Sequence, residues 1–245
     1  MRVVAGLAVV AVLVSTVAAE ARPASDEAVP IAPCVKGTER SGAVRIRTSD
    51  GVKLVGVVLG RGRVGIALGH ERNGTLCNWL PFARRLAAQG YRVVAFDHRG
   101  HGDSDYPPYP RNLALDKDVV AAVGELRRRG STRFVVMGAS MGATVALVAA
   151  PQLGRSLAAA IDLSGPAQYV RLDAIPAVRR MSAPGLFAVG RFDTGFVEDT
   201  RKLESVSRHP GSRLVIRQTG AHGTAMLADP SFSALVLAFV KRHSG

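Results

Sequence analysis

Short apolar runs that alternate with stretches of helical periodicity constrain the fold of this chain more than any other feature. Six such runs lie at residues 64–68, 91–96, 134–137, 158–163, 185–189 and 213–216. Helical patterns span residues 79–89, 115–129, 141–149, 197–207 and 232–242. Short strands that are apolar throughout must be covered on both faces, which is typical of a parallel sheet flanked by helices. The alternation therefore predicts an α/β fold with a mostly parallel central sheet and helices on both of its faces.

The first part of the predicted domain departs from this alternation. Two strand-like runs, Val44–Thr48 and Lys53–Leu59, flank the turn sequence Ser49-Asp50-Gly51, so we expect an antiparallel hairpin at the start of the sheet. A chain of 245 residues accommodates one sizeable α/β domain. No internal repeat or second domain is evident, and we assign a single domain to residues 44–245.

The amino-terminal residues have the pattern of an export signal. Arg2 precedes the apolar stretch Val3–Ala19, and Ala19-Glu20-Ala21 resembles a signal-peptide cleavage site. We interpret residues 1–21 as a signal peptide and residues 22–43 as an N-terminal extension, with an uncleaved membrane anchor as the alternative. The mature protein is then expected to be secreted or associated with the cell envelope.

The chain has two cysteines, Cys34 and Cys77, and both lie beyond the predicted signal peptide. An even number of cysteines in an oxidising compartment favours one disulfide, which would tie the N-terminal extension to the first predicted helix. Two separate thiols are the alternative.

The formal net charge of +13 is carried mainly by arginines. These arginines are scattered along the chain and do not form a basic stripe interleaved with aromatic residues, so we expect no nucleic-acid partner. A weak attraction to an anionic cell surface is compatible with this charge. We expect a monomer.

The segment Gly138–Gly142 reads Gly-Ala-Ser-Met-Gly and directly follows a buried-strand pattern. This context indicates a strand, a sharp turn and a helix, with Ser140 on the turn at the carboxyl end of the strand. Glycines flank such a serine because the backbone is strained and a nearby Cβ would collide with neighbouring elements. Taken alone, the motif is also compatible with a tight turn that has no catalytic role.

Two residues that could activate this serine also follow predicted strands. Asp193 comes after the run 185–189, and His222 comes after the run 213–216. A serine becomes nucleophilic when a neutral imidazole accepts its proton, and the imidazole in turn needs a carboxylate to fix its tautomer. The carboxyl ends of parallel strands meet at one edge of a sheet. The chain order Ser140, Asp193, His222 therefore predicts a catalytic triad.

With these residues the chain resembles the α/β-hydrolase superfamily over roughly residues 44–240. The resemblance rests on the serine motif, Asp193, His222 and the segment 97–104, which reads Asp-His-Arg-Gly-His-Gly-Asp-Ser. It implies that Ser140 is the nucleophile, that His222 is the general base and then the general acid, and that Asp193 orients His222. The backbone N–H of Met141 would be one donor of the oxyanion hole.

The loop Gly69–Arg72 departs from the family pattern, because Glu71 stands where a glycine is common. The second oxyanion donor is then the backbone N–H of Glu71 or of Arg72, and we prefer Arg72. His98 and His101 have a spacing that could suggest a metal site, but without a set of acidic or thiol partners we interpret them as loop residues.

These features predict a secreted serine hydrolase that cleaves carboxylic ester or related acyl bonds through an acyl-enzyme, without a cofactor. About twenty residues separate the strand at Ile161 from the strand at Gly185, which leaves no room for a cap domain. We expect an open cleft that accepts small esters, or lipid or polymer esters. An acyltransferase and a non-catalytic extracellular binding protein on the same fold are the alternatives.

Overall fold

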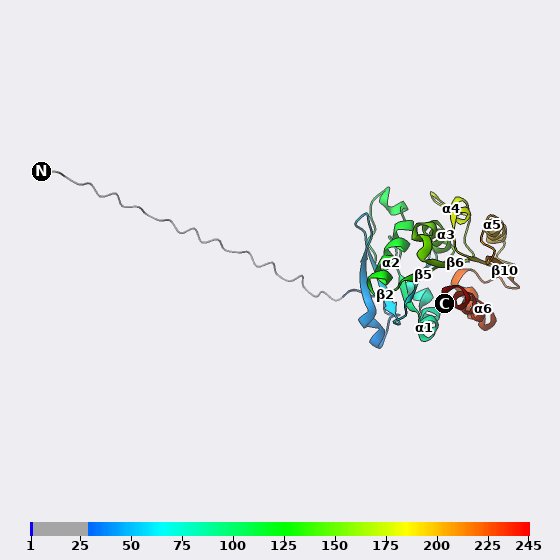
Figure 1. Cartoon of the computed structure of the whole chain (residues 1–245), viewed down its shortest axis with the longest axis horizontal. Coiled ribbons are helices and arrows are strands. Elements are labelled where there is room, and N and C mark those ends of the chain that lie inside the picture. Colours follow the sequence, from blue (N-terminus) through cyan, green and yellow to red (C-terminus); the bar gives the residue numbers. More distant parts are fainter. Residues whose placement is uncertain (2–28) are drawn as a thin grey trace.

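A computed structural model describes Met1 and residues 29–245 (Figure 1). The predicted signal peptide at residues 1–21 therefore lies outside the described residues, except for Met1. The strands are β1 (Ala43–Arg47), β2 (Lys53–Leu59), β3 (Val64–Gly69), β4 (Arg92–Phe96), β5 (Arg133–Ala139), β6 (Leu157–Leu163), β7 (Gln168–Tyr169), β8 (Leu172–Asp173), β9 (Gly185–Gly190) and β10 (Arg213–Arg217). The α-helices are α1 (Leu80–Ala88), α2 (Asp116–Arg128), α3 (Met141–Ala149), α4 (Ala174–Arg180), α5 (Thr194–Ser205) and α6 (Pro230–Ser244). Short 3-10 helices are η1 (Gly37–Gly42), η2 (Leu76–Trp79), η3 (Arg111–Leu113), η4 (Ala150–Ser156) and η5 (Gly223–Ala228).

Eight of these strands form one sheet in the order β1-β2-β4-β3-β5-β6-β9-β10. The β1–β2 and β2–β4 pairs are antiparallel, and the remaining pairs, from β4 to β10, are parallel. The predicted α/β fold, with a hairpin at the start of a mostly parallel sheet, is confirmed. The carboxyl ends of β3, β4, β5, β6, β9 and β10 all lie at one edge of the sheet, hereafter the carboxyl edge.

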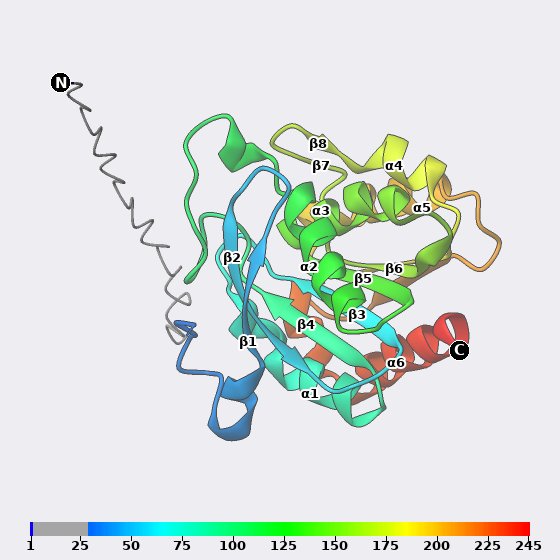
Figure 2. The same ribbon diagram turned by 60° about the vertical axis from the view of Figure 1, so that its left-hand side comes forward.

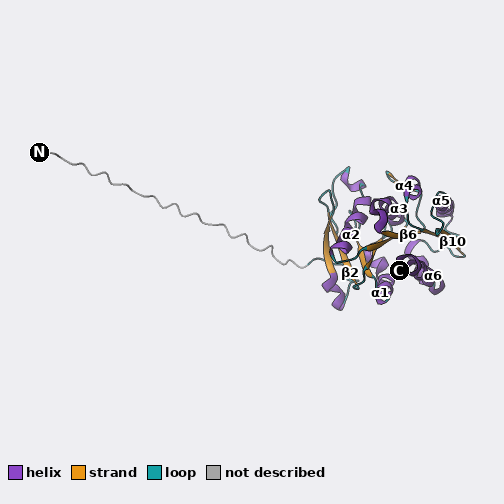
Figure 3. Cartoon of the chain, in the orientation of Figure 1, coloured by secondary structure: helices purple, strands orange, loops and turns teal. Residues whose placement is uncertain are grey.

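Helices cover both faces of the sheet, as Figure 3 shows. Helices α1 and α6 pack on one face, and α2, α3, α4 and α5 pack on the other. Alternate side chains along a strand point to opposite faces, so Val136 of β5 belongs to the core under α3, while Val135 and Met137 belong to the core under α6. Each central strand is buried on both faces, which explains its continuous apolar sequence.

The segment between β6 and β9 contains elements that the sequence did not predict. A two-stranded ribbon, β7–β8, is followed by α4, whose first turn is capped by the Asp173 carboxylate accepting the Ile175 N–H at 2.9 Å. Two-residue strands are too short to show periodicity. These elements are small, and this interval holds no cap domain.

The predicted pairing of Cys34 with Cys77 is confirmed. A disulfide joins them, with 5.8 Å between their Cα atoms. It fastens the segment before β1 to η2, at the start of α1. Within residues 29–245, every helix is too short or too polar to span a lipid bilayer.

Candidate active site

Ser140 lies on the sharp turn between β5 and α3. Its backbone has φ 50° and ψ −120°, a conformation that is costly for a residue with a Cβ. Two hydrogen bonds hold the turn: the Ser140 N–H donates to the Leu163 carbonyl at 2.9 Å, and the Ala143 N–H donates to the Ser140 carbonyl at 2.9 Å. This turn places Ser140 at the carboxyl edge of the sheet, where the residue is partly exposed.

The glycines of the serine motif are required by close packing. A Cβ on Gly138 would overlap the backbone of Gly142, the second residue of α3. A Cβ on Gly142 would overlap the carbonyl oxygens of Gly69, the last residue of β3, and of His70, which follows it. The two glycines therefore allow α3 to approach both its own strand and the loop in which the second oxyanion donor was predicted.

Asp193 and His222 form a hydrogen-bonded pair at the same edge. Asp193 follows β9 and His222 follows β10, and His222 Nδ1 lies 2.8 Å from Asp193 Oδ2. The carboxylate accepts the Nδ1–H, so in the neutral imidazole Nε2 is the nitrogen that can accept a proton. The Phe196 ring packs against His222 with 4.4 Å between ring centroids.

The loop that carries His222 lies beside the serine turn. Strands β5, β6, β9 and β10 are successive neighbours in the sheet. A Cβ built on Gly223, the residue after His222, would lie 3.2 Å from the Cβ of Ala139, the residue before Ser140. The fold thus brings Ser140, Asp193 and His222 to one short stretch of the carboxyl edge.

Glu71 joins the Gly69–Arg72 loop to the loop of His222. Its Oε1 accepts the Thr224 N–H at 2.7 Å and also accepts the Thr224 hydroxyl, while Oε2 is buried without a hydrogen-bond partner among the described residues. The sequence marked Glu71 as unusual for the family but gave no sign of this contact, because Thr224 is 153 residues away.

Backbone donors for an oxyanion are available next to the serine. Met141 is the first residue of α3, where backbone N–H groups have no acceptor within the helix. In the part of the chain that the structure describes, neither Glu71 nor Arg72 donates its backbone N–H to another residue, so either group is free to bind an oxyanion.

Comparison with known proteins identifies the family. Residues 60–214 match the family model described as serine aminopeptidase, S33. The chain belongs to this family. Consistent with the sheet order, it has the fold of the α/β hydrolases.

Solved structures of hydrolases share this fold at low sequence identity. An esterase from Pyrococcus furiosus is 23% identical, with a TM-score of 0.70 over 83% of this chain and 92% of that one. An esterase from Exiguobacterium antarcticum is 16% identical, with a TM-score of 0.68 over 81% and 99% of the two chains. An enol-lactonase from Burkholderia xenovorans is 16% identical, with a TM-score of 0.66 over 79% and 98%. No curated protein is significantly similar to the chain in sequence.

In this α/β hydrolase a buried polar network underlies the loop Gly69–Arg72. His70 is fully buried; its Nδ1–H donates to the Glu71 carbonyl at 2.6 Å, and its Nε2 accepts the His98 N–H at 3.0 Å. Burial, followed by the neighbouring His98, lowers the pKa of His70 well below its ordinary value, so the ring is neutral. His101 Nε2 lies 2.7 Å from the Arg72 carbonyl. His98 and His101 thus make structural contacts with the loop Gly69–Arg72.

One buried carboxylate beside the serine turn was missed by the sequence analysis. Asp162 lies in β6 opposite Gly138 of β5, and it is fully buried. Its Oδ1 accepts the Gly165 N–H at 2.7 Å, while Oδ2 has no hydrogen-bond partner among the described residues. Burial raises the pKa of Asp162 to about 8, so the group is mainly protonated at neutral pH. The only sequence signal was an acidic residue inside an apolar run.

Proposed function

We propose that this protein is a serine hydrolase that cleaves carboxylic ester bonds through an acyl-enzyme. In this proposal Ser140 is the nucleophile, His222 is the general base and Asp193 orients the imidazole. The observation that supports it most directly is the Asp193–His222 hydrogen bond beside a serine on a strained strand-to-helix turn. The descriptions of several structural neighbours as esterases agree with it.

The proposed reaction has two steps. His222 Nε2 accepts the Ser140 hydroxyl proton as the serine oxygen attacks the ester carbonyl, and Asp193 stabilises the imidazolium that forms. The backbone N–H groups of Met141 and Arg72 bind the oxyanion. His222 then protonates the leaving alcohol, and water releases the acyl group by the same route.

The charges around the site favour an ester over a peptide with a free amino terminus. An aminopeptidase needs an available carboxylate to bind the substrate ammonium group. Glu71 is engaged by Thr224 and Asp193 by His222, and the exposed carboxylates Asp103 and Asp105 lie on the loop after β4, two strands from the serine strand. Arg72 and Arg191, on the loops after β3 and β9, are exposed cations. The family name therefore does not decide the bond that is cleaved.

A substrate panel tests this proposal. p-Nitrophenyl esters from acetate to palmitate should be hydrolysed, aminoacyl p-nitroanilides should not, and Ser140→Ala should lower turnover by at least about ten-thousand-fold. A fluorophosphonate probe should label the parent and not Ser140→Ala. Ester cleavage at the parental rate by Ser140→Ala would refute the assignment.

The same experiments separate the alternatives. Absence of labelling at Ser140 would favour a binding protein. Formation of a new ester, in preference to the free acid, when an alcohol acceptor is added would favour an acyltransferase.

We also propose that the protein is exported. The Cys34–Cys77 disulfide supports an oxidising compartment, where such bonds persist. Fractionation of the producing cells, with sequencing of the mature amino terminus, should find the protein outside the cytoplasm and starting after residue 21. An intact amino terminus on cytoplasmic protein would contradict this.

A further inference from the structure

The large apolar side chains exposed on this protein gather at the edge that carries the candidate active site. Among residues 29–245 four are exposed: Tyr106 (75%), Tyr109 (78%), Val170 (62%) and Phe192 (64%). Tyr106 and Tyr109 lie after β4, Val170 lies after β6, and Phe192 lies directly after β9. All four therefore belong to loops that leave the carboxyl edge of the sheet. Single exposed apolar residues are ordinary, but their restriction to one edge is not.

These side chains lie on both sides of Ser140. In the sheet, β4 is two strands from β5 in one direction and β9 is two strands away in the other. At about 4.8 Å per strand, each flank begins roughly 10 Å from the serine strand. Figure 2 shows the loop after β4 and the β7–β8 ribbon at the same edge of the molecule.

Val170 shows that this exposure has a conformational cost. It lies at the tip of the β7–β8 ribbon with φ 53°. A β-branched residue rarely adopts positive φ, and glycine or asparagine would do so at lower cost. An exposed valine in this conformation gains nothing from packing that would offset the strain. A contact outside the chain would explain why an apolar side chain stands there.

Arginines accompany the apolar side chains. Arg171 follows Val170, Arg191 precedes Phe192, and Arg111 is close to Tyr109 in sequence. These arginines and Arg72 are all exposed, and within the described residues none forms an ion pair. The exposed carboxylates of the same loops are Asp103 and Asp105. The edge is thus both apolar and positively charged.

We propose that this edge docks the protein on an anionic lipid surface. The docking rim is defined as Tyr106, Tyr109, Val170 and Phe192 with Arg72, Arg111, Arg171 and Arg191. Aromatic side chains settle at the boundary between water and lipid, and arginines are attracted to anionic head groups. Separate anchors on several loops suit a deformable lipid surface better than a protein partner, which needs a continuous complementary patch. Docking would face Ser140 toward the lipid, so under the proposed function the substrates would be lipid esters.

Vesicle binding tests the rim. All measurements use the full chain with Ser140→Ala, because binding then reports docking whether or not Ser140 is catalytic. The probes are vesicles of phosphatidylcholine with about one third phosphatidylglycerol, and vesicles of phosphatidylcholine alone. Binding to the anionic vesicles should be stronger and should weaken at high salt.

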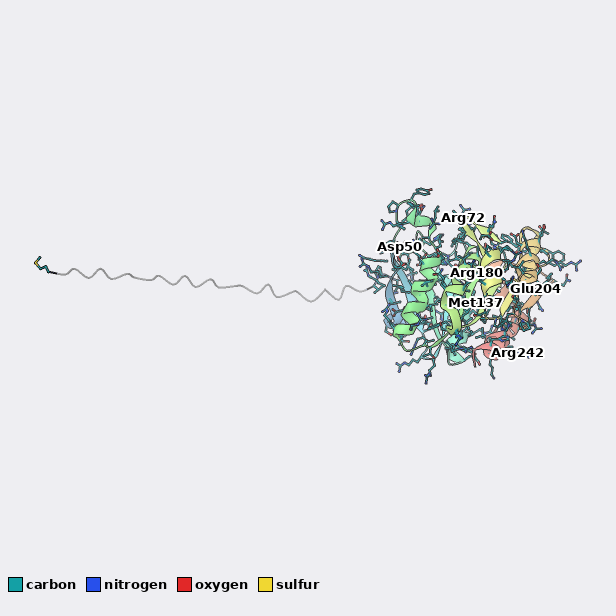
Figure 4. All side chains as sticks on the ribbon, turned by 45° about the horizontal axis from the view of Figure 1, so that its top comes forward. Asp50, Arg72, Met137, Arg180, Glu204 and Arg242 are labelled. Atoms are coloured by element: carbon teal, nitrogen blue, oxygen red, sulfur yellow. A yellow bond between two sulfur atoms is a disulfide. The ribbon has the colours of Figure 1, made fainter. Side chains whose placement is uncertain are left out.

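Two charge variants separate the rim from net charge. A rim variant carries Arg111→Gln, Arg171→Gln and Arg191→Gln. A matched control carries Arg133→Gln, Arg155→Gln and Arg242→Gln, which remove the same charge near the amino ends of the parallel strands. Figure 4 shows Arg72 toward the top and Arg242 toward the bottom of the folded part of the chain. The rim variant should lose about tenfold or more in affinity for the anionic vesicles, and the control should lose much less.

A second variant tests the apolar anchors. Val170→Asn with Phe192→Ser should weaken vesicle binding, while Val170→Asn alone should raise the melting temperature because it relieves backbone strain. The proposal would be overturned if the arginine rim variant and its control lost equal affinity for the anionic vesicles. It would also be overturned if the arginine rim variant and the variant Val170→Asn with Phe192→Ser both bound like the parent, or if the parent did not bind. Because every variant has the same amino terminus, any anchoring by that segment cancels in the comparison. Failure of the triad would appear separately, as unaltered hydrolysis of soluble esters by Ser140→Ala.

Discussion

The buried carboxyl group of Asp162 should make this protein less stable as the pH rises. In the folded state burial raises its pKa to about 8, against an ordinary value of 3.8. Above pH 4 ionisation of this group lowers the free energy of the unfolded chain, whereas in the folded chain the group does not ionise until about pH 8. The stability that is fully present below pH 4 is therefore lost progressively through this window.

The size of the effect follows from the shift. One pH unit of difference between the two states corresponds to about 1.36 kcal/mol, so by pH 7 the cost reaches about 4 kcal/mol as an upper figure. Relaxation of the surroundings of Asp162 and entry of water would reduce it. Asp162→Asn keeps the size of the side chain and an oxygen to accept the Gly165 N–H, but it cannot ionise. The variant should be more stable than the parent at pH 7, and the advantage should fade toward pH 4.

Urea unfolding of the parent and Asp162→Asn, with the disulfide intact, measures this difference at intervals from pH 4.5 to 8.5. Other titrating groups are common to both proteins and cancel in the comparison. Asp103→Asn makes the same chemical change at an exposed position, and it should alter the free energy of unfolding by less than about 0.5 kcal/mol at pH 7. A difference between Asp162→Asn and the parent that does not change with pH would refute the reasoning.

Three further predictions concern the packing of α3, the disulfide and the loops of the candidate site. Gly142→Ala should lower the free energy of unfolding by about 3 kcal/mol, because the new methyl group meets the carbonyls of Gly69 and His70. Gly124→Ala, in open space on α2, should raise the free energy of unfolding slightly. Similar changes in the two variants would contradict the packing argument. Replacing Cys34 and Cys77 with alanine should cost up to about 4 kcal/mol in urea unfolding for a closed loop of this length, and the parent should become equally unstable in a reductant. Glu71→Ala should lower kcat for a soluble ester by about tenfold to a hundredfold with little change in KM, since it frees the His222 loop. Thr224→Val should add little to Glu71→Ala, and fully additive losses would show that the two residues act separately.

The sequence predicted the sheet well because the buried strands are almost entirely apolar and are followed by recognisable turns. Ser140 could be placed on its turn from the strand pattern before it, the two flanking glycines and the helical pattern after it. The β7–β8 ribbon could not be predicted, since strands of two residues carry no periodicity. The Glu71–Thr224 contact was also out of reach, because it joins loops that are adjacent only after the parallel sheet has formed. Asp162 was visible as an acidic residue in an apolar run, but its state depends on the burial of β6 between β5 and β9.

The absence of a cap domain between β6 and β9 explains both the polar contacts within this edge and its exposed side chains. That interval holds only the β7–β8 ribbon and α4, so contacts within the edge itself fix the loops that carry the proposed catalytic groups. The buried His70 and the outer-loop residue His101 both contact the Gly69–Arg72 loop, and Glu71 fastens it to the His222 loop. Groups that are held in place before substrate arrives stabilise a developing charge at little reorganisation cost. With the site ordered by these contacts, the outer loops are free to present apolar and basic side chains to a surface, which is the arrangement that docking on a lipid would require.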